Sequence, residues 1–174
     1  MFDPRQFRNA LGHFATGVTI VTTRGTEGEP VGVTVNSFAS VSLDPPLILW
    51  SLAKNSYSLA AFTATDHFAV HVLASSQQGL SDRFARAASD KFSGLELDSG
   101  IGDAPLLDGC ATVFECSTEH RYDGGDHLIL VGRVQHFEVH DRAPLLFYRG
   151  CYAAPEPETM SFGGLMHAVS PVAA

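Results

Sequence analysis

Residues 32–46 decide the fold of this chain, and they read Gly32-Val33-Thr34-Val35-Asn36-Ser37-Phe38-Ala39-Ser40-Val41-Ser42-Leu43-Asp44-Pro45-Pro46. Valines alternate with small polar residues up to Asn36, which is the period-two pattern of a β-strand. The two adjacent prolines at the end stop the run. The segment therefore predicts one strand, a sharp corner and a second strand.

The same segment concentrates hydroxyl and amide groups beside the ring of Phe38. Short polar side chains and open backbone N–H groups on a rigid strand can position a flat, polar, anionic cofactor without supplying charge. A barrel corner that is simply rich in Ser and Thr explains the pattern as well, so both interpretations stay open at this point. The polar side chains are Thr34, Asn36, Ser37, Ser40 and Ser42.

Outward from this segment, the chain alternates short β-like runs with a few inserted helices. Asp3 and Pro4 predict a helix start, because Asp is a good N-cap and Pro suits the first helical position. Many short strands with helices inserted between them favour a closed antiparallel barrel over a doubly wound parallel sheet. We expect strands near 18–23, 31–37, 38–43, 47–52, 67–73, 111–119, 127–140 and 145–148, and further helices at 57–64 and 76–88.

The length of 174 residues favours one domain, which we place at residues 1–153. Residues 89–108 are rich in Gly, Asp and Ser, and are expected to form a loop. Residues 154–174 show little periodicity and are expected to be a C-terminal tail that is loose or folds over a partner.

Composition excludes several classes of protein. The net charge of −8, with only two lysines, argues against nucleic-acid binding, which needs a positive surface. No apolar run approaches the length of a membrane span. The three cysteines form no CxxC pair and the N-terminus lacks the shape of a signal peptide, so we expect a cytoplasmic protein with reduced, buried thiols.

Motifs of several common sites are missing from the sequence. There is no GxGxxG after a strand, no GxxxxGK[ST] and no GxSxG, which argues against a Rossmann fold, a P-loop and a hydrolase elbow. His67 and His71 are four residues apart, as are His136 and His140. Both pairs fall in strand-like runs, where four residues span roughly 13 Å, so we expect no metal site.

Lys54 is the most informative cation of the chain. It lies in Ser51-Leu52-Ala53-Lys54-Asn55-Ser56, after an apolar strand and before a predicted helix. A helix N-terminus presents free N–H groups to an anion, and lysine adds a point charge. The segment is either a phosphate cradle or a solvated turn with a capping serine.

Five segments, in order along the chain, resemble the short-chain flavin reductases, the small NAD(P)H:flavin oxidoreductases that feed two-component monooxygenases. The resemblance covers roughly residues 5–153. Each segment alone is a weak signal, but five in the same order are specific. They are residues 15–23, 34–46, 49–56, 124–127 (Gly-Gly-Asp-His) and 144–150.

The resemblance implies a mainly β fold, namely an FMN-binding split β-barrel of Greek-key antiparallel type that forms a homodimer. It implies FMN or FAD as cofactor, NADH or NADPH as co-substrate, and transient transfer of reduced flavin to a monooxygenase. It implies no metal and no protein nucleophile. The alternatives are a flavin-binding carrier or sensor without activity, and a structural barrel without a cofactor.

The resemblance also assigns roles to individual residues. The flavin ring would contact the segment Thr34, Val35, Asn36, Ser37, Ser40, Val41 and Ser42, and its phosphate the segment Ser51, Leu52, Ala53, Lys54 and Ser56. His127 would be the catalytic residue beside the nicotinamide, with a weaker indication for Tyr148. As simpler interpretations, His127 is a turn residue and Phe84 a core residue. Four more residues would contact the cofactor, namely Arg83, Phe84, Lys91 and Phe92.

Overall fold

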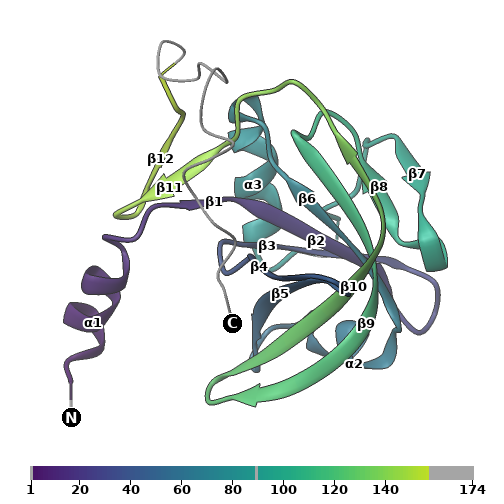
Figure 1. Cartoon of the computed structure of the whole chain (residues 1–174), viewed down its shortest axis with the longest axis horizontal. Coiled ribbons are helices and arrows are strands. Elements are labelled where there is room, and N and C mark those ends of the chain that lie inside the picture. Colours follow the sequence, from purple (N-terminus) through teal and green to yellow (C-terminus); the bar gives the residue numbers. More distant parts are fainter. Residues whose placement is uncertain (1, 89, 157–174) are drawn as a thin grey trace.

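A seven-stranded antiparallel sheet forms the body of the molecule in a computed structural model that describes residues 2–88 and 90–156 (Figure 1). Its strands, in order across the sheet, are β3 (Pro30–Val35), β2 (Thr19–Arg24), β6 (His67–Val72), β9 (Thr112–Gly124), β10 (His127–Val139), β5 (Pro46–Ala53) and β4 (Ala39–Leu43). The predicted antiparallel barrel is thereby confirmed.

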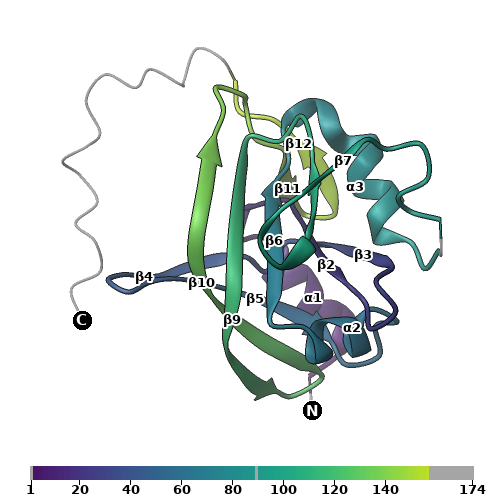
Figure 2. The same ribbon diagram turned by 90° about the vertical axis from the view of Figure 1, so that its right-hand side faces the viewer.

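The barrel closes where the corner after β3 meets β5. The Ser37 hydroxyl accepts the Ser51 N–H at 2.9 Å and donates to the Ser51 carbonyl oxygen at 3.2 Å. One side chain therefore bridges two elements that share no ladder of backbone hydrogen bonds. No strand ladder joins β3 to β5 here, so the barrel is split at this point. Strand β4 pairs with the edge of β5 that does not face β10, and Figure 2 shows β4 extending from the body of the molecule.

Alternating side chains fill the barrel with an aromatic core. In β5 every second residue points inward, so Ile48, Trp50 and Leu52 are buried while their neighbours are not. The Trp50 ring meets Phe62 edge-on, with 4.9 Å between ring centroids. Phe62 belongs to α2 (Leu59–Ala64), which covers one end of the barrel. Burial of such rings is the main stabilising contribution to this fold.

Helix α1 (Pro4–Leu11) lies away from the barrel, next to a separate small sheet (Figure 1). The Asp3 carboxylate accepts the Arg5 N–H at 2.9 Å, which confirms the predicted helix start. None of the residues of α1 is buried. The three-stranded sheet beside it consists of β1 (Thr16–Gly17), β11 (Leu146–Tyr148) and β12 (Cys151–Ala153), in that order.

Several sequence-based boundaries were wrong. Residues 89–108 are not simply a loop, because β7 (Leu97–Ser99) and β8 (Pro105–Leu107) pair within them. The Thr22 hydroxyl donates to the Pro105 carbonyl at 2.6 Å, so tertiary contacts hold β8 on the barrel. Helix α3 is shorter than expected (Gln78–Ala85), and the expected 57–64 helix begins at Leu59.

The cysteines only partly match the prediction of buried thiols. Cys110 and Cys116 are buried, and burial raises the pKa of these thiols to about 11 and about 12 respectively. Cys151 is exposed, because it lies on the edge strand β12.

The description of the chain ends at Glu156, so residues 157–174 of the predicted tail lie outside the described residues. The domain boundary at residue 153 therefore stays a prediction.

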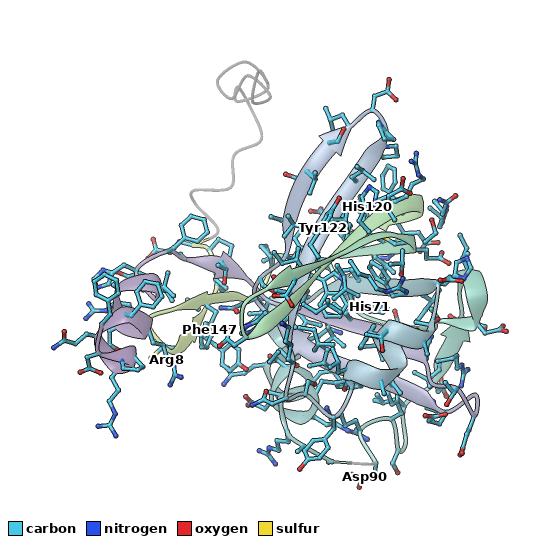
Figure 3. The ribbon with its side chains drawn as sticks, turned by 90° about the horizontal axis from the view of Figure 1, so that it is seen from below. Arg8, His71, Asp90, His120, Tyr122 and Phe147 are labelled. Atoms are coloured by element: carbon cyan, nitrogen blue, oxygen red, sulfur yellow. The ribbon has the colours of Figure 1, made fainter. Side chains whose placement is uncertain are left out.

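The ring of His71, on β6, has a hydrogen-bond partner at each of its two nitrogen atoms. His71 is buried inside the barrel (Figure 3), where its Nδ1 lies 3.1 Å from the Ile20 carbonyl and its Nε2 accepts the Leu107 N–H at 3.1 Å. Burial lowers its pKa to about 4. Across residues 2–88 and 90–156, no three His, Cys, Asp or Glu side chains gather as metal ligands.

Within the same ranges, no helix has the length and apolar character needed to span a membrane.

Candidate functional site

A pocket of about 650 Å³ opens between β3, the segment after β5 and the end of α3. Four of the predicted cofactor residues line it, although they come from three separate segments of the chain. These are Ser56, Phe84, Lys91 and Phe92. The pocket is in the size range of small-molecule and cofactor sites.

Two phenylalanines form its apolar wall against Gly32. Phe84 is fully buried and meets Phe92 edge-on, with 4.9 Å between ring centroids. A Cβ on Gly32 would lie 2.6 Å from the Phe84 ring and 3.0 Å from Phe92. Glycine is therefore needed here for close approach of the rings to the strand. The core interpretation of Phe84 holds, but the same ring also borders the pocket.

Lys91 brings a positive charge to this wall. Its ammonium group donates to the carbonyl oxygens of Gly32 at 3.1 Å and Phe84 at 3.0 Å. Burial lowers its pKa, and within the part of the chain that the structure describes no carboxylate pairs with it. An ammonium group held only by neutral carbonyls keeps its attraction for an anionic ligand.

Arg83 holds the loop that carries Lys91. Its guanidinium group donates to the carbonyl oxygens of Asp90, at 3.2 Å, and Ser93. It lines a second hollow of about 460 Å³, which shares Arg86 and Lys91 with the first pocket. In this structure Arg83 therefore shapes the loop rather than facing the larger pocket.

In the predicted ring-binding segment, some side chains are engaged within the protein and others are exposed. The Thr34 hydroxyl donates to the Ser81 carbonyl at 2.7 Å, and Ser37 is engaged with Ser51. Val35 packs against the barrel core, and Leu52 is part of it. The side chains of Asn36, Ser40 and Val41 are exposed, while Ser42 is half-buried on β4.

Lys54 and His127 lie together where β5 ends and β10 begins. Ala53 is the register partner of His127, and the Lys54 N–H donates to the Asp126 carbonyl at 2.9 Å. The Lys54 ammonium group pairs with Asp123 at 2.5 Å and does not line the large pocket. The sequence did not indicate this acidic partner, because it comes from the strand-end of β9, 69 residues further along.

The GGDH segment holds the His127 ring in one orientation. Nδ1 lies 2.7 Å from the Asp126 carboxylate, and this hydrogen bond is the main cause of the lowered pKa of Asp126. An ionised carboxylate only accepts hydrogen bonds, so Nδ1 carries the proton and Nε2 is left as an acceptor in the neutral ring. Gly125, at φ +77, makes the turn that brings Asp126 and His127 to the strand start.

Tyr148 is not close to His127 within one chain. It lies on β11 in the three-stranded sheet, with its ring edge-on to His13 at 6.4 Å between centroids. Figure 3 shows Phe147 of the same strand near α1, whereas the labelled His120 and Tyr122 belong to β9 of the seven-stranded sheet. The structure therefore assigns Tyr148 and His127 to different regions of the protomer.

Sequence reasoning missed most of the pocket lining. Of these residues, Tyr57 is an almost fully exposed ring next to Ser56, and Arg86 is a second cation beside Lys91. Their positions depend on how α3 packs on β3, which no local motif indicates. The lining residues not predicted are Glu29, Pro30, Val31, Gly32, Val33, Tyr57, Ser58, Ala85, Arg86, Ala87 and Ala88.

Comparison with known proteins shows which family the chain resembles. A probable flavin reductase of Rhizobium meliloti is 44% identical over 155 residues, which cover 89% of this chain and 50% of that protein. The chain therefore spans about half the length of this relative. An FMN reductase (NADH), SmoA, of Agrobacterium fabrum is 49% identical, over 86% of this chain and 85% of that protein.

A solved structure has the same architecture. The NADH:FAD oxidoreductase SgcE6 of Streptomyces globisporus, in complex with NAD and FAD fragments, matches with a TM-score of 0.85 and 37% identity. The match covers 91% of this chain and 98% of that one. Residues 11–156, which include every predicted site residue, match the family described as flavin reductase like domain. The chain accordingly belongs to the flavin reductase like domain family.

Proposed function

We propose that this protein is an NAD(P)H:flavin oxidoreductase that reduces FMN or FAD and supplies the reduced flavin to a partner monooxygenase. The observation that carries the proposal is the pocket bordered by Ser56, Phe84, Lys91 and Phe92 in a member of the flavin reductase like domain family. An apolar aromatic wall beside the cations Lys91 and Arg86 suits a flat ring that carries a phosphate.

The protein's contribution to the reaction is binding and orientation. Flavin and nicotinamide supply the hydride chemistry between them when both are bound. Lys91 and Ser56 hold the anionic part of the flavin in the pocket, and Phe84 and Phe92 exclude water from its apolar part. Bringing the two rings together accounts for a large part of the rate acceleration in such reactions.

Lys54 and His127 act at the same end of β5 as Ser56, where β10 begins. Lys54 contributes a charge that attracts the flavin phosphate once it leaves Asp123. The Nε2 atom of His127, held as an acceptor by Asp126, accepts a hydrogen bond from the amide group of the nicotinamide. The hydroxyl groups of Thr34 and Ser37 fasten the ring-binding segment to the backbone of Ser81 and Ser51, rather than touching the ring.

Purified protein tests this function directly. We expect NADH or NADPH oxidation that depends on added FMN or FAD, together with saturable flavin binding in a fluorescence titration. A yellow protein without NAD(P)H oxidation would instead support a carrier or sensor. A colourless protein that ignores both flavins would exclude any flavin function.

The working unit is proposed to be a homodimer in the cytoplasm. Phe7, Leu11 and Phe14 are 54%, 59% and 79% exposed on and after α1, which contributes nothing to the core of its own chain. Exposed apolar side chains on a protruding helix are typical of a protein–protein interface. Leu43 of β4 and Val139 of β10 are further exposed apolar side chains. Light scattering that finds only an 18.6 kDa species would contradict the dimer.

A further inference from the structure

The last described strand of the chain is tied to α3 by one phenol group. The Tyr152 hydroxyl, on β12, donates to the Asp82 carboxylate at 3.0 Å and lies 2.8 Å from the Ser81 hydroxyl. Ser81 is fully buried, and the Tyr152 oxygen is the partner of its hydroxyl within the described residues. The Tyr152 ring is itself held edge-on against Phe147, with 5.4 Å between centroids.

The direction of these hydrogen bonds follows from the groups involved. The Asp82 carboxylate only accepts, so the single phenol proton goes to Asp82. The Ser81 hydroxyl then donates to the Tyr152 oxygen, and all three groups are satisfied. Burial, with the Asp82 carboxylate beside it, raises the pKa of Tyr152 above its ordinary value.

Ser81 connects the Tyr152 hydroxyl to the pocket in two ways. The carbonyl group of Ser81 accepts the Thr34 hydroxyl, so α3 is fastened to β3 at the same residue that Tyr152 holds. One turn later, Phe84 and Ala85 of α3 form part of the pocket lining. A displacement of Ser81 would therefore move both the ring-binding segment and the apolar wall.

We propose that Tyr152 is a positioning residue for the cofactor pocket: it latches the three-stranded sheet onto α3 through Ser81 and Asp82. The proposal rests on the flavin reductase function stated above. Because β12 pairs with β11, and β11 with the strand that follows α1, the latch also connects the exposed N-terminal helix to the pocket. Packing of α1 on a second copy would then favour the flavin-binding arrangement.

The test compares the full-length protein with Tyr152→Phe, which removes the hydroxyl and keeps the ring. Hydrogen exchange of residues 78–92 without flavin should become faster, because Ser81 loses its buried partner. The dissociation constant for flavin should rise about three- to tenfold, the factor expected for one net hydrogen bond. The kcat at saturating flavin should change less than about twofold, since the latch acts on binding rather than on the bound rings.

Two further variants sharpen the test. Ser81→Ala breaks the same latch from α3, so combining it with Tyr152→Phe should add little to either single effect. Tyr122→Phe is the matched control, because it removes a phenol hydroxyl on the β9–β10 hairpin away from α3. It should leave exchange of residues 78–92 and flavin affinity unchanged.

Unchanged exchange in both Tyr152→Phe and Ser81→Ala would overturn the latch. Faster exchange with unchanged flavin affinity would overturn its positioning role, and so would a fall in melting temperature as the sole effect. Wild-type protein that binds no flavin would refute the proposed function instead, while the exchange measurement in the absence of flavin would still decide whether the latch exists.

Discussion

Gly32→Ala is expected to disturb the pocket and the stability of the fold together. Adding one methyl group places a Cβ 2.6 Å and 2.8 Å from two atoms of the Phe84 ring, and 3.0 Å from Phe92. These distances are shorter than van der Waals contact. Phe84 is fully buried and packed edge-on against Phe92, so it cannot shift without displacing Phe92. The rings and the loop bearing Lys91 must therefore move.

The size of the effect follows from overpacking in a buried site. Inserting a methyl group into a well-packed core destabilises a protein by about 1–3 kcal/mol. For a chain of 174 residues, that corresponds to a fall in melting temperature of roughly 2–4 °C per kcal/mol. Backbone strain does not contribute, because Gly32 is not in the left-handed region. Flavin affinity should fall as well, because the displaced rings and Lys91 border the pocket.

Thermal unfolding and flavin titration of the same preparations measure both effects. Gly79→Ala is the matched control, since a Cβ there meets no atom within 4 Å and Gly79 lies inside α3. Alanine is the better helix former, so this control should be as stable as the wild type or more stable by about 0.5–1 kcal/mol. A Gly32→Ala protein with wild-type melting temperature and flavin affinity would refute the account of the Phe84–Phe92 wall.

Three other perturbations test separate parts of the structure. Burial lowers the pKa of His71 to about 4, so its stabilising contribution is complete above pH 6.5 and is lost as the pH falls from 6.5 towards 4. Urea unfolding should therefore show a loss of roughly 3 kcal/mol over that range, which His71→Gln reduces; equal pH dependence in both proteins would contradict this. Lys54→Ala should weaken flavin binding about tenfold, with a smaller effect on turnover at saturating flavin, because a charge-assisted phosphate contact contributes about 1.5 kcal/mol or more; an unchanged titration would exclude the phosphate role. His127→Ala should raise the KM for NADH without changing flavin affinity, because the role proposed for its Nε2 is to bind the nicotinamide; normal NADH kinetics would leave it as a turn residue.

Much of the barrel could be predicted from local sequence patterns. The alternation of valines in residues 31–37 and the inward residues of β5 follow directly from the period of two along a strand. The N-cap at Asp3 likewise depends on residues next to it in the chain. These features were predicted correctly because their causes lie within a few residues.

Other features were missed because their causes lie far apart in the sequence. Strand β8 looks like a loop from its own residues, yet the Thr22 hydroxyl, 83 positions away, holds Pro105 in place. The pairing of the Lys54 ammonium group with Asp123 on another strand likewise has no signal in the residues around Lys54. No periodic pattern encodes contacts of this kind.

The sequence by itself therefore determined the antiparallel strands, the inserted helices and the family of this protein, since each rests on local periodicity or on motifs in a set order. Only the tertiary structure decided which hydroxyl groups are free for a ligand. Thr34 and Ser37 were equal candidates in the sequence, but folding engages one with Ser81 and the other with Ser51. The physical reason is that a half-buried hydroxyl must find a hydrogen-bond partner, and packing alone determines which group is near enough to serve.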